Sequence, residues 1–282
     1  MTRSSGNGIV APGMAEFFTQ SGDPPSLKSR LLNGEKLYGA LCLSYSPVNA
    51  EILGWAGYDF VVVDMEHGPG DTFSALPVLR ALNSARTPAI IRVPDNDEIY
   101  VKKALDLGPA GIMFPKVDNA EEARNAVASC RYPPYGIRGA APPLIRASRY
   151  GLDSTYLETC EQDLLIMCQA ESEEAVNNLQ EITEVEGVDC VHFGPRDLRA
   201  SMGLLRHPED PRGLAMLKKG ERAVLASGKK MLLGGFATPE SSPAEMYDRG
   251  YNLVCGAVDV AMFRDAAVAD LKKNKIKLKI TR

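Results

Sequence analysis

The sequence predicts an α/β protein of the (β/α)8 TIM-barrel class, for three reasons. From Ser26 onward, short apolar runs alternate with amphipathic stretches of helical periodicity, and no linker interrupts them. About eight such strand–helix units fit in roughly 240 residues, the usual size of this barrel. Several apolar runs end in acid–base residues, and barrel enzymes collect their functional groups at the carboxyl ends of the strands. An open doubly wound sheet is the competing fold, but no GxGxxG follows the first strand.

The elements follow one another in a regular order. A helix is expected from Ser26 to about Gly34, ahead of the repeat. Strands are expected near residues 38–44, 60–66, 88–93, 111–117, 164–170, 190–194, 230–236 and 252–257. Helical patterns fill the gaps between these strands, as the barrel requires.

Helix starts and ends can be placed at several positions. Asn119 and Glu122 have the spacing of a capping box, and Ser172 can open a second helix in the same way. Gly250 is expected to close a helix just before the last strand. The inward faces of the first two helices are predicted to contain Ala123, Ala126, Val127 and Cys130, and Ala175, Val176, Leu179 and Ile182.

Pro77 conflicts locally with the helical pattern around it. A proline is tolerated in the first turn of a helix but removes a hydrogen bond further inside it. Pro77 must therefore lie in the first turn of a helix that starts near Ser74, or kink a longer helix that starts at Asp71.

One segment between the fourth and fifth strands is longer than the other connections. It runs from Arg131 to Gln162 and includes the Pro/Gly-rich stretch Tyr132–Gly139. Long loops of this kind often carry function, so the segment could cover or border the site.

Composition and charge exclude several classes of protein. The 282 residues carry a net charge of −4 with no basic stripe, and no apolar run approaches the ~20 residues of a membrane span, so neither nucleic acid nor membrane is an expected partner. The six cysteines are scattered, which is typical of a reducing compartment and indicates a cytoplasmic location. Residues 1–25 are expected to be a flexible arm, or the remnant of an organelle-targeting extension. Residues 26–282 are expected to form a single domain.

The stretch Val61–Pro69 contains an unusual group of polar residues. A β-branched run ends in Asp64, Glu66 and His67, and the two carboxylates share one face of the strand. Such groups cost desolvation free energy unless they are paired or bound, which indicates function. Asp64 could orient the His67 imidazole so that one ring nitrogen accepts a proton, although a structural loop histidine is the alternative.

Two further carboxylates are the best metal-ligand candidates. Glu171 and Asp197 follow neighbouring strands, and no Cys or His pair lies near them. Two carboxylates suit a hard, six-coordinate cation such as Mg²⁺, Mn²⁺ or Co²⁺. The alternative is that each caps a helix or pairs with an arginine.

Arg92 ends the third strand, where a guanidinium can hold a carboxylate or stabilise an oxyanion. A structural ion pair with Asp64 or Glu66 is the alternative. His192 lies in the middle of a strand and is expected to be in the core or the barrel interior. Together the cation, the base and Arg92 suit enolate chemistry on a 2-oxo acid, followed by aldol cleavage or addition.

The chain resembles the HpcH/HpaI family of metal-dependent pyruvate aldolases, which includes 2,4-dihydroxyhept-2-ene-1,7-dioate and 2-keto-3-deoxyglucarate aldolases, from about Lys36 to Arg264. It is especially similar to plant and related members. The motifs that carry the resemblance are Ala56–Phe60, Asp64-Met65-Glu66-His67, Ile91-Arg92-Val93-Pro94, Lys103–Gly108, Tyr132–Gly139, Arg146-Ala147-Ser148, Gln169-Ala170-Glu171, Glu186–Asp189 and Gly194–Leu198.

The resemblance implies a role for each matching residue. Glu171 and Asp197 would bind the metal, and His67 supported by Asp64 would position the metal-bound water or relay protons. Arg92 would stabilise the enolate. The remaining matches are Gln169 in the same pocket, main-chain amides around Gly194, Pro195 and Arg196 that would hold the pyruvate carboxylate, and Asp106 reaching a neighbouring subunit's site. The implied assembly is a homohexamer, a trimer of dimers with a swapped C-terminal helix.

Two departures from bacterial aldolases affect the acceptor side. Arg196 stands where they carry alanine, and Gly235-Phe236 replaces a smaller aliphatic pair beside the aldehyde pocket. The resemblance therefore implies cleavage of a 4-hydroxy-2-oxo acid to pyruvate and an aldehyde of unknown identity. Oxaloacetate decarboxylation, or cleavage of a malyl- or citramalyl-CoA ester, is the alternative with the same enolate. A barrel that only binds a metabolite is the non-enzymatic alternative.

Overall fold

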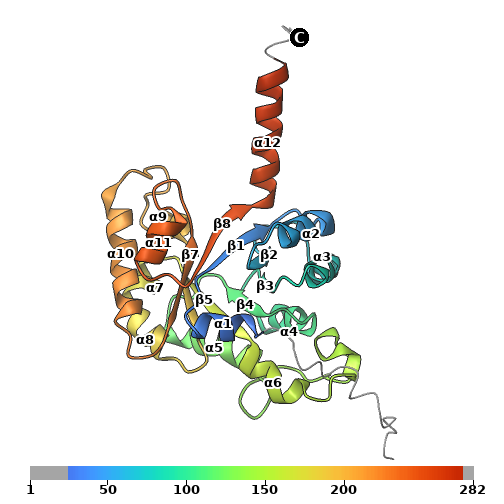
Figure 1. The fold of residues 1–282 in the computed structure, drawn as a ribbon. Helices are drawn as coiled ribbons and strands as arrows, with labels where there is room; N and C mark the ends of the chain where they lie inside the picture. The colour runs from blue at the N-terminus through green and yellow to red at the C-terminus, as the bar shows by residue number, and fades with distance from the viewer. Residues whose placement is uncertain (1–24, 276–282) are drawn as a thin grey trace, which may run out of the picture.

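The computed structural model describes residues 25–275, which form a closed barrel of eight strands in the order β1 to β8 (Figure 1). Each strand is parallel to the next, and β8 pairs with β1. The strands are β1 (Leu37–Cys42), β2 (Phe60–Asp64), β3 (Ala89–Arg92), β4 (Gly111–Phe114), β5 (Leu165–Ala170), β6 (Cys190–Phe193), β7 (Leu232–Phe236) and β8 (Leu253–Val258). The predicted barrel is confirmed, and each strand lies within a few residues of its predicted place. The predicted arm, residues 1–25, falls outside the described residues apart from Pro25.

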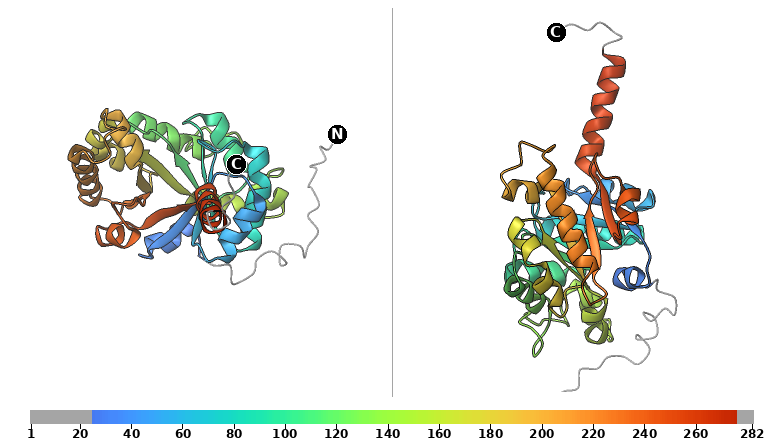
Figure 2. Two further views of the ribbon diagram at one scale, coloured as in Figure 1. Left: turned by 90° about the horizontal axis from the view of Figure 1, so that it is seen from above. Right: turned by 90° about the vertical axis from the view of Figure 1, so that its left-hand side faces the viewer.

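Helices follow the strands and surround them (Figure 2). They are α1 (Leu27–Leu32), α2 (Pro47–Trp55), α3 (Thr72–Ser84), α4 (Glu98–Asp106), α5 (Ala120–Cys130), the 3-10 segment η2 (Arg146–Gly151), α6 (Tyr156–Asp163), α7 (Glu173–Asn177), α8 (Leu179–Glu184), α9 (Pro195–Ser201), α10 (Pro211–Leu225), α11 (Pro243–Asp248) and α12 (Asp259–Asn274). Because the strands are parallel, their carboxyl ends all open at one end of the barrel, the mouth.

The core has an inner and an outer part. Inside the barrel, side chains from all eight strands pack together, and Leu27 and Leu31 of α1 join them from the end opposite the mouth. Outside the barrel, alternate strand residues pack against the surrounding helices. The helix faces predicted to point inward are buried. Helix α1 therefore closes the floor and leaves the mouth open to carry chemistry.

The helix caps follow the predictions with two differences. Asn119 accepts a hydrogen bond from the Glu122 amide, but the Glu122 carboxylate accepts from the Asp118 amide, so the capping box is only half formed. Ser172 caps its helix as predicted, yet the helix divides at Asn178 into α7 and α8. Gly250 follows α11 with a φ of +104°, which suits glycine.

Pro77 lies inside the longer of the two helices considered. Helix α3 begins at Thr72, and the Asp71 side chain caps it by accepting a hydrogen bond from the Ser74 amide. Since Pro77 has no N–H, one hydrogen bond of this helix is missing.

The expectation that the Arg131–Gln162 segment covers or borders the site is wrong for this chain. Arg146 donates a hydrogen bond to the Leu107 carbonyl just after α4, and the segment borders a cavity near Pro88 and Leu164, which precede β3 and β5. These contacts lie at the floor of the barrel, because each helix returns the chain to the end where the next strand begins. Figure 1 shows α6, which belongs to this segment, below the barrel and away from α12.

Helix α12 projects from the mouth side of the barrel, and from above it is seen nearly end-on (Figure 2). Asp259 fixes its start to the end of β1: the carboxylate accepts hydrogen bonds from the Leu43 and Ser44 amides and from the Ser44 hydroxyl. Along α12 Phe263 is 76% exposed and Leu271 56%. Such apolar exposure is unusual on a helix that packs against its own domain.

The expectations for the cysteines and for membrane spans can both be compared with the described residues. All six cysteines are free, and five of them are buried, as expected of small apolar side chains. Between residues 25 and 275, no helix has the length and hydropathy that a membrane span requires.

Candidate functional site

A buried ion pair forms the centre of the barrel mouth. Asp64 ends β2 and Arg92 ends β3, and the two residues are register partners on neighbouring strands. Arg92 donates from Nε to Oδ1 of Asp64 at 2.8 Å and from Nη2 to Oδ2 at 2.5 Å, and both side chains are at most 5% exposed. The two-point contact fixes the guanidinium plane, and Nη1 takes no part in the contact with Asp64.

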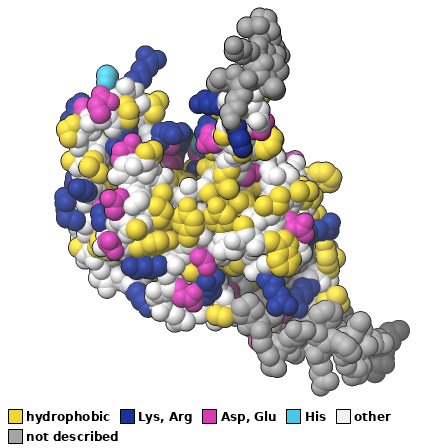
Figure 3. Space-filling view, turned by 45° about the horizontal axis from the view of Figure 1, so that its top comes forward, with side chains coloured by type: hydrophobic (Ala, Val, Ile, Leu, Met, Phe, Trp, Pro, Cys, Tyr) yellow, Lys and Arg dark blue, Asp and Glu magenta, His cyan; other side chains and the backbone are white. Residues whose placement is uncertain are grey.

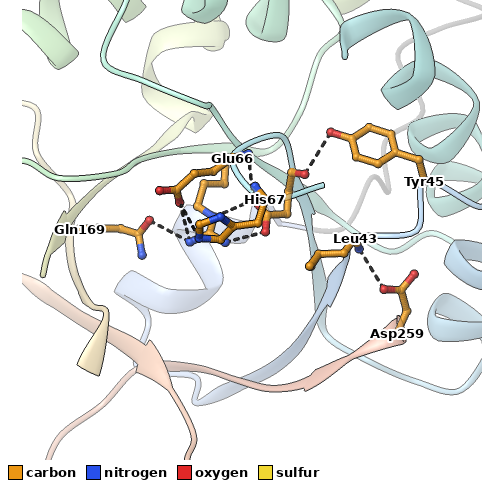
Figure 4. Close-up of polar contacts among 8 residues, drawn as sticks. Leu43, Tyr45, Glu66, His67, Gln169 and Asp259 are labelled. Atoms are coloured by element: carbon orange, nitrogen blue, oxygen red, sulfur yellow. Dashed lines mark hydrogen bonds and ion pairs between the residues drawn. The ribbon is translucent and has the colours of Figure 1, made fainter. Parts of the chain in front are cut away.

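Nη1 of Arg92 lies between two further polar side chains. It donates to Oε1 of Gln169 at 3.3 Å and lies 2.9 Å from Oε2 of Glu66. Figure 4 shows Glu66, His67 and Gln169 converging on one place, with Tyr45 and Asp259 to one side. Because Oε1 of Gln169 accepts from Arg92, its amide nitrogen must donate to another group, yet it has no partner within the described residues.

The predicted contact between the Asp64 carboxylate and the His67 imidazole is absent. Asp64 accepts a hydrogen bond from the His67 main-chain amide at 3.4 Å, and the rest of its capacity is used by Arg92 and the Glu66 amide. The imidazole is 58% exposed, and its Nε2 lies 3.8 Å from Oε2 of Glu66. Asp64 pairs with Arg92 because a guanidinium satisfies a buried carboxylate at two points, which an imidazole cannot do.

Glu171 and Asp197 face the same mouth from β5 and β6. Glu171 follows β5 and is 4% exposed, and its Oε1 accepts a hydrogen bond from the Lys116 amide at 2.9 Å. Asp197 lies in the first turn of α9 and is exposed. Gly194, the N-cap residue of α9, lies against Glu171, and a Cβ there would overlap Oε2 of that carboxylate. Glycine is therefore required at position 194 for the Glu171 carboxylate to occupy this place.

The mouth carries more negative charge than Arg92 neutralises. The pKa of Glu171 is raised to about 7, by burial first and then by the charges of Glu66 and Asp197, although the Lys116 hydrogen bond and the charge of Arg92 oppose the shift. The pKa of Glu66 is also raised, by burial first and then by Asp64 and Asp197, although Arg92 and His67 oppose the shift. Like charges that raise one another's pKa in this way are stabilised by an added cation.

The donor set fits a hard divalent cation that keeps part of its coordination for other ligands. Glu171 and Asp197 can supply carboxylate oxygens, the ligands that such cations prefer. Within residues 25–275, no group of three or more His, Cys, Asp or Glu side chains is placed to bind a metal together. A cation held by these two carboxylates would therefore take its remaining ligands from water or substrate.

Two backbone positions that sequence reasoning missed also support the site. Tyr45 and Lys116 have positive φ angles of 55° and 49°, which are uncommon for residues other than glycine. The Tyr45 hydroxyl donates to the Asp64 carbonyl at 3.1 Å, while the Lys116 amide donates to Glu171. Backbone strain of this kind tends to occur near functional sites, but the sequence gives no local signal of it.

His192 and Phe236 lie beside Arg92 in the barrel. As expected, His192 is in the interior; it is 0% exposed, and its ring meets Phe236 edge-on at 4.5 Å. The Arg92 guanidinium lies 5.7 Å from the centre of the Phe236 ring. Phe236 therefore lies beside Arg92 and His192 at the mouth, and its place beside an aldehyde stays a prediction.

Three other predicted site residues, Asp106, Arg196 and Pro195, lie farther from the ion pair or lack a side chain that could bind a ligand there. Asp106 ends α4 at the floor of the barrel, where it pairs with Arg138 at 3.0 Å, so it is not in its own chain's mouth. Arg196 is exposed at the start of α9. Pro195 has no N–H, so only the amides of Arg196 and Asp197 in this first turn can donate to a ligand.

The sequence is similar to that of a known protein family. The HpcH/HpaI aldolase/citrate lyase family matches residues 38–266. A hydroxypyruvate/pyruvate aldolase of Delftia acidovorans is 35% identical over 245 residues, which are 86% of this chain and 90% of that protein. A 5-keto-4-deoxy-D-glucarate aldolase of Klebsiella pneumoniae is 36% identical over 248 residues, which are 86% of this chain and 94% of that protein.

Solved structures show the same relationship. A crystal structure of an HpcH/HpaI aldolase/citrate lyase family protein from Burkholderia cenocepacia superposes with a TM-score of 0.78 at 34% identity. The alignment covers 88% of this chain and 98% of that one. The predicted fold, family and enzyme class, a pyruvate aldolase, are confirmed together. The chain belongs to the HpcH/HpaI aldolase/citrate lyase family.

Proposed function

We propose that the protein is a divalent-metal-dependent aldolase that reversibly cleaves a 4-hydroxy-2-oxo acid to pyruvate and an aldehyde. One observation carries the proposal: the carboxylates of Glu66, Glu171 and Asp197 exceed the charge of Arg92 at the barrel mouth. The named relatives are aldolases of 2-oxo acids, in agreement with this chemistry.

Glu171 and Asp197 would hold Mg²⁺, Mn²⁺ or Co²⁺. When bound, the cation supplies Lewis-acid polarisation of the substrate's oxo group. Asp64 would keep Arg92 in place, so that the positive charge of the guanidinium can stabilise the oxygen of the developing enolate. The free amide of Gln169 would donate to the same 2-oxo acid.

The remaining residues would bind the ends of the substrate and move protons. The main-chain amides of Arg196 and Asp197 would donate to the substrate carboxylate, because first-turn amides have no acceptor within their own helix. Phe236 would border the aldehyde. His67, which is exposed next to Glu66, would accept or return the proton at Nε2.

The assembly would be a homohexamer, a trimer of dimers that exchange α12. The exposed apolar side chains of α12, including Phe263, support exchange, because a second copy could bury them. Figure 3 shows hydrophobic side chains gathered on the face below this helix. In such an assembly Asp106 would reach a neighbouring subunit's site. Sedimentation of the full chain beside a chain ending before Asp259 tests the exchange.

The reaction is tested by proton exchange. In D2O the methyl protons of pyruvate should exchange with Mg²⁺, Mn²⁺ or Co²⁺ present and stop when a chelator is added. No exchange with any of the three metals would refute the proposal. Exchange accompanied by oxaloacetate or CoA-ester cleavage, but by no 4-hydroxy-2-oxo acid cleavage, would favour the alternative fate of the enolate.

A further inference from the structure

The interior of the barrel next to Arg92 contains more unpartnered polar atoms than the proposed reaction uses, because the substrate would take one N–H of the Gln169 amide and leave the other N–H and both His192 ring nitrogens. Both ring nitrogens of His192 are buried without a hydrogen-bond partner among the described residues, and so is Nε2 of Gln169. A buried polar atom left unpaired costs free energy that a hydrogen-bond partner would recover. Orphaned groups on neighbouring strands therefore indicate that a polar guest binds between them.

The two residues are placed to share one guest. Gln169 on β5 and His192 on β6 are register partners in adjacent strands, and both are 0% exposed. His192 also pairs in register with Gly234 of β7, where a Cβ would lie 2.8 Å from Cδ2 of the imidazole. The glycine makes room for the His192 ring, and Phe236 packs against that ring on its mouth side.

The chemistry of these atoms restricts what can bind. Burial, assisted by the charge of Arg92, lowers the pKa of His192 to about 3, so its ring is neutral in the physiological range. A neutral imidazole has one donor and one acceptor nitrogen, and the Gln169 amide adds donors. A small neutral oxygen that both donates and accepts satisfies this set, whereas an ion does not.

We propose that His192 and the Gln169 amide form a subsite for one hydroxyl-type oxygen beside Arg92. The oxygen belongs either to an ordered water molecule or to a hydroxyl group at C3 of the 2-oxo acid substrate. Through this oxygen His192 acts as a positioning residue: it holds the Gln169 amide, which in turn contacts Nη1 of Arg92. The inference deepens the proposed function and rests on it for its effect on turnover.

The subsite can be detected without turnover. The chain has only three histidines, so ¹⁵N-histidine NMR of the metal-free protein can resolve His192, with a His192→Phe variant to assign it. We expect a neutral ring from pH 5 to pH 8, with ring-nitrogen shifts of a hydrogen-bonded tautomer in the free protein if water is the guest. If the substrate hydroxyl is the guest, those shifts should appear only on adding hydroxypyruvate.

Proton-exchange kinetics provide a second, independent test of the subsite. His192→Phe removes both nitrogens, and His192→Asn keeps a donor and an acceptor. With water as the guest, His192→Phe should slow exchange of both pyruvate and hydroxypyruvate by about tenfold, and His192→Asn should recover most of the loss. With the substrate hydroxyl as the guest, only hydroxypyruvate exchange should slow.

Failure of the proposed function and failure of the subsite proposal give different results. Wild-type protein that exchanges neither substrate refutes the proposed function, while the ring-nitrogen shifts still decide whether the subsite exists. The subsite is refuted if those shifts show no hydrogen bond with or without hydroxypyruvate. It is also refuted if both variants, folded by circular dichroism, exchange both substrates at the wild-type rate.

Discussion

Two of the Asp–Arg pairs, Asp64–Arg92 and Asp106–Arg138, lie at opposite ends of the barrel and differ in their surroundings. At the mouth, Arg92 interacts with Asp64, Glu66 and Glu171. At the floor, the one carboxylate that acts strongly on Arg138 is Asp106, and the guanidinium stacks 4.6 Å from the Tyr132 ring. The floor pair is balanced in charge, whereas the mouth pair has a surplus of carboxylates.

The comparison separates structural from functional ion pairs. A single Asp–Arg contact at a barrel's floor is enough to join two segments, here α4 and the Arg131–Gln162 segment. Surplus buried carboxylates raise the free energy of the fold, since each costs desolvation that a lone arginine cannot offset. Such a surplus is expected where another charge is to be bound, and the following experiments test that difference.

The largest effect is expected from Arg92→Ala. Loss of an oxyanion donor should slow pyruvate methyl exchange by about 10²–10³-fold, and the unpaired Asp64 should lower the free energy of unfolding by about 3–5 kcal/mol. NMR exchange rates and urea unfolding measure the two effects. Arg212→Ala removes an exposed pair with Asp210 and should change neither. A folded Arg92→Ala protein with wild-type exchange would remove Arg92 from the mechanism.

A smaller effect is expected from Gly194→Ala. The added methyl group would displace the Glu171 carboxylate, so the affinity for Mn²⁺ should fall by about 10–100-fold. Calorimetric titration measures this affinity. Gly228→Ala is the matched control, because a Cβ there meets no atom within 4 Å. Equal affinity in both variants would contradict the assigned place of Glu171.

The pH dependence of the free energy of unfolding should show that His192 stays neutral in the folded protein. Its pKa of about 3 in the folded protein lies below the unfolded value of 6.5, so the unfolded chain binds the proton first as the pH falls. The stabilisation is complete above about pH 6.5 and should decrease by about 2 kcal/mol between pH 8 and pH 5. His192→Phe should lose this part of the slope. Parallel stability curves for the two proteins would show that His192 does not stay neutral.

The smallest effect on stability is expected at the floor. The Asp106 side chain is 30% exposed, so Asp106→Asn should cost at most about 1 kcal/mol. Turnover should nevertheless fall if Asp106 reaches a neighbouring subunit's site, and thermal unfolding measured beside steady-state kinetics compares the two. Wild-type turnover in the intact oligomer would limit Asp106 to a structural role.

The sequence predicted the strands well because each is a short apolar run with clear flanking signals. It also identified the polar residues of the mouth, since Asp64, Arg92 and Glu171 stand at or next to the ends of strands. Their partners were harder to predict. The Asp64–Arg92 contact was only one of the alternatives for Arg92, because it depends on strand register, which residue spacing along the chain does not encode.

Two other features were beyond sequence reasoning for physical reasons. The place of the Arg131–Gln162 segment depends on tertiary contacts such as Arg146 with the Leu107 carbonyl, so loop composition alone gave the wrong end of the barrel. The positive φ of Lys116 is imposed by its surroundings, and no glycine marks it. Features decided by side-chain packing between distant strands, such as His192 against Phe236, require the structure.

The central claim is that surplus carboxylates at the mouth bind a divalent cation. Electron paramagnetic resonance of Mn²⁺ titrated into the protein tests this directly, with Glu171→Gln as the variant and Glu174→Gln, an exposed neighbour on α7, as the control. We predict that the wild type and the control each bind one Mn²⁺ per chain and that Glu171→Gln does not at the same concentrations. Equal Mn²⁺ binding by all three proteins, or by none, would contradict the claim.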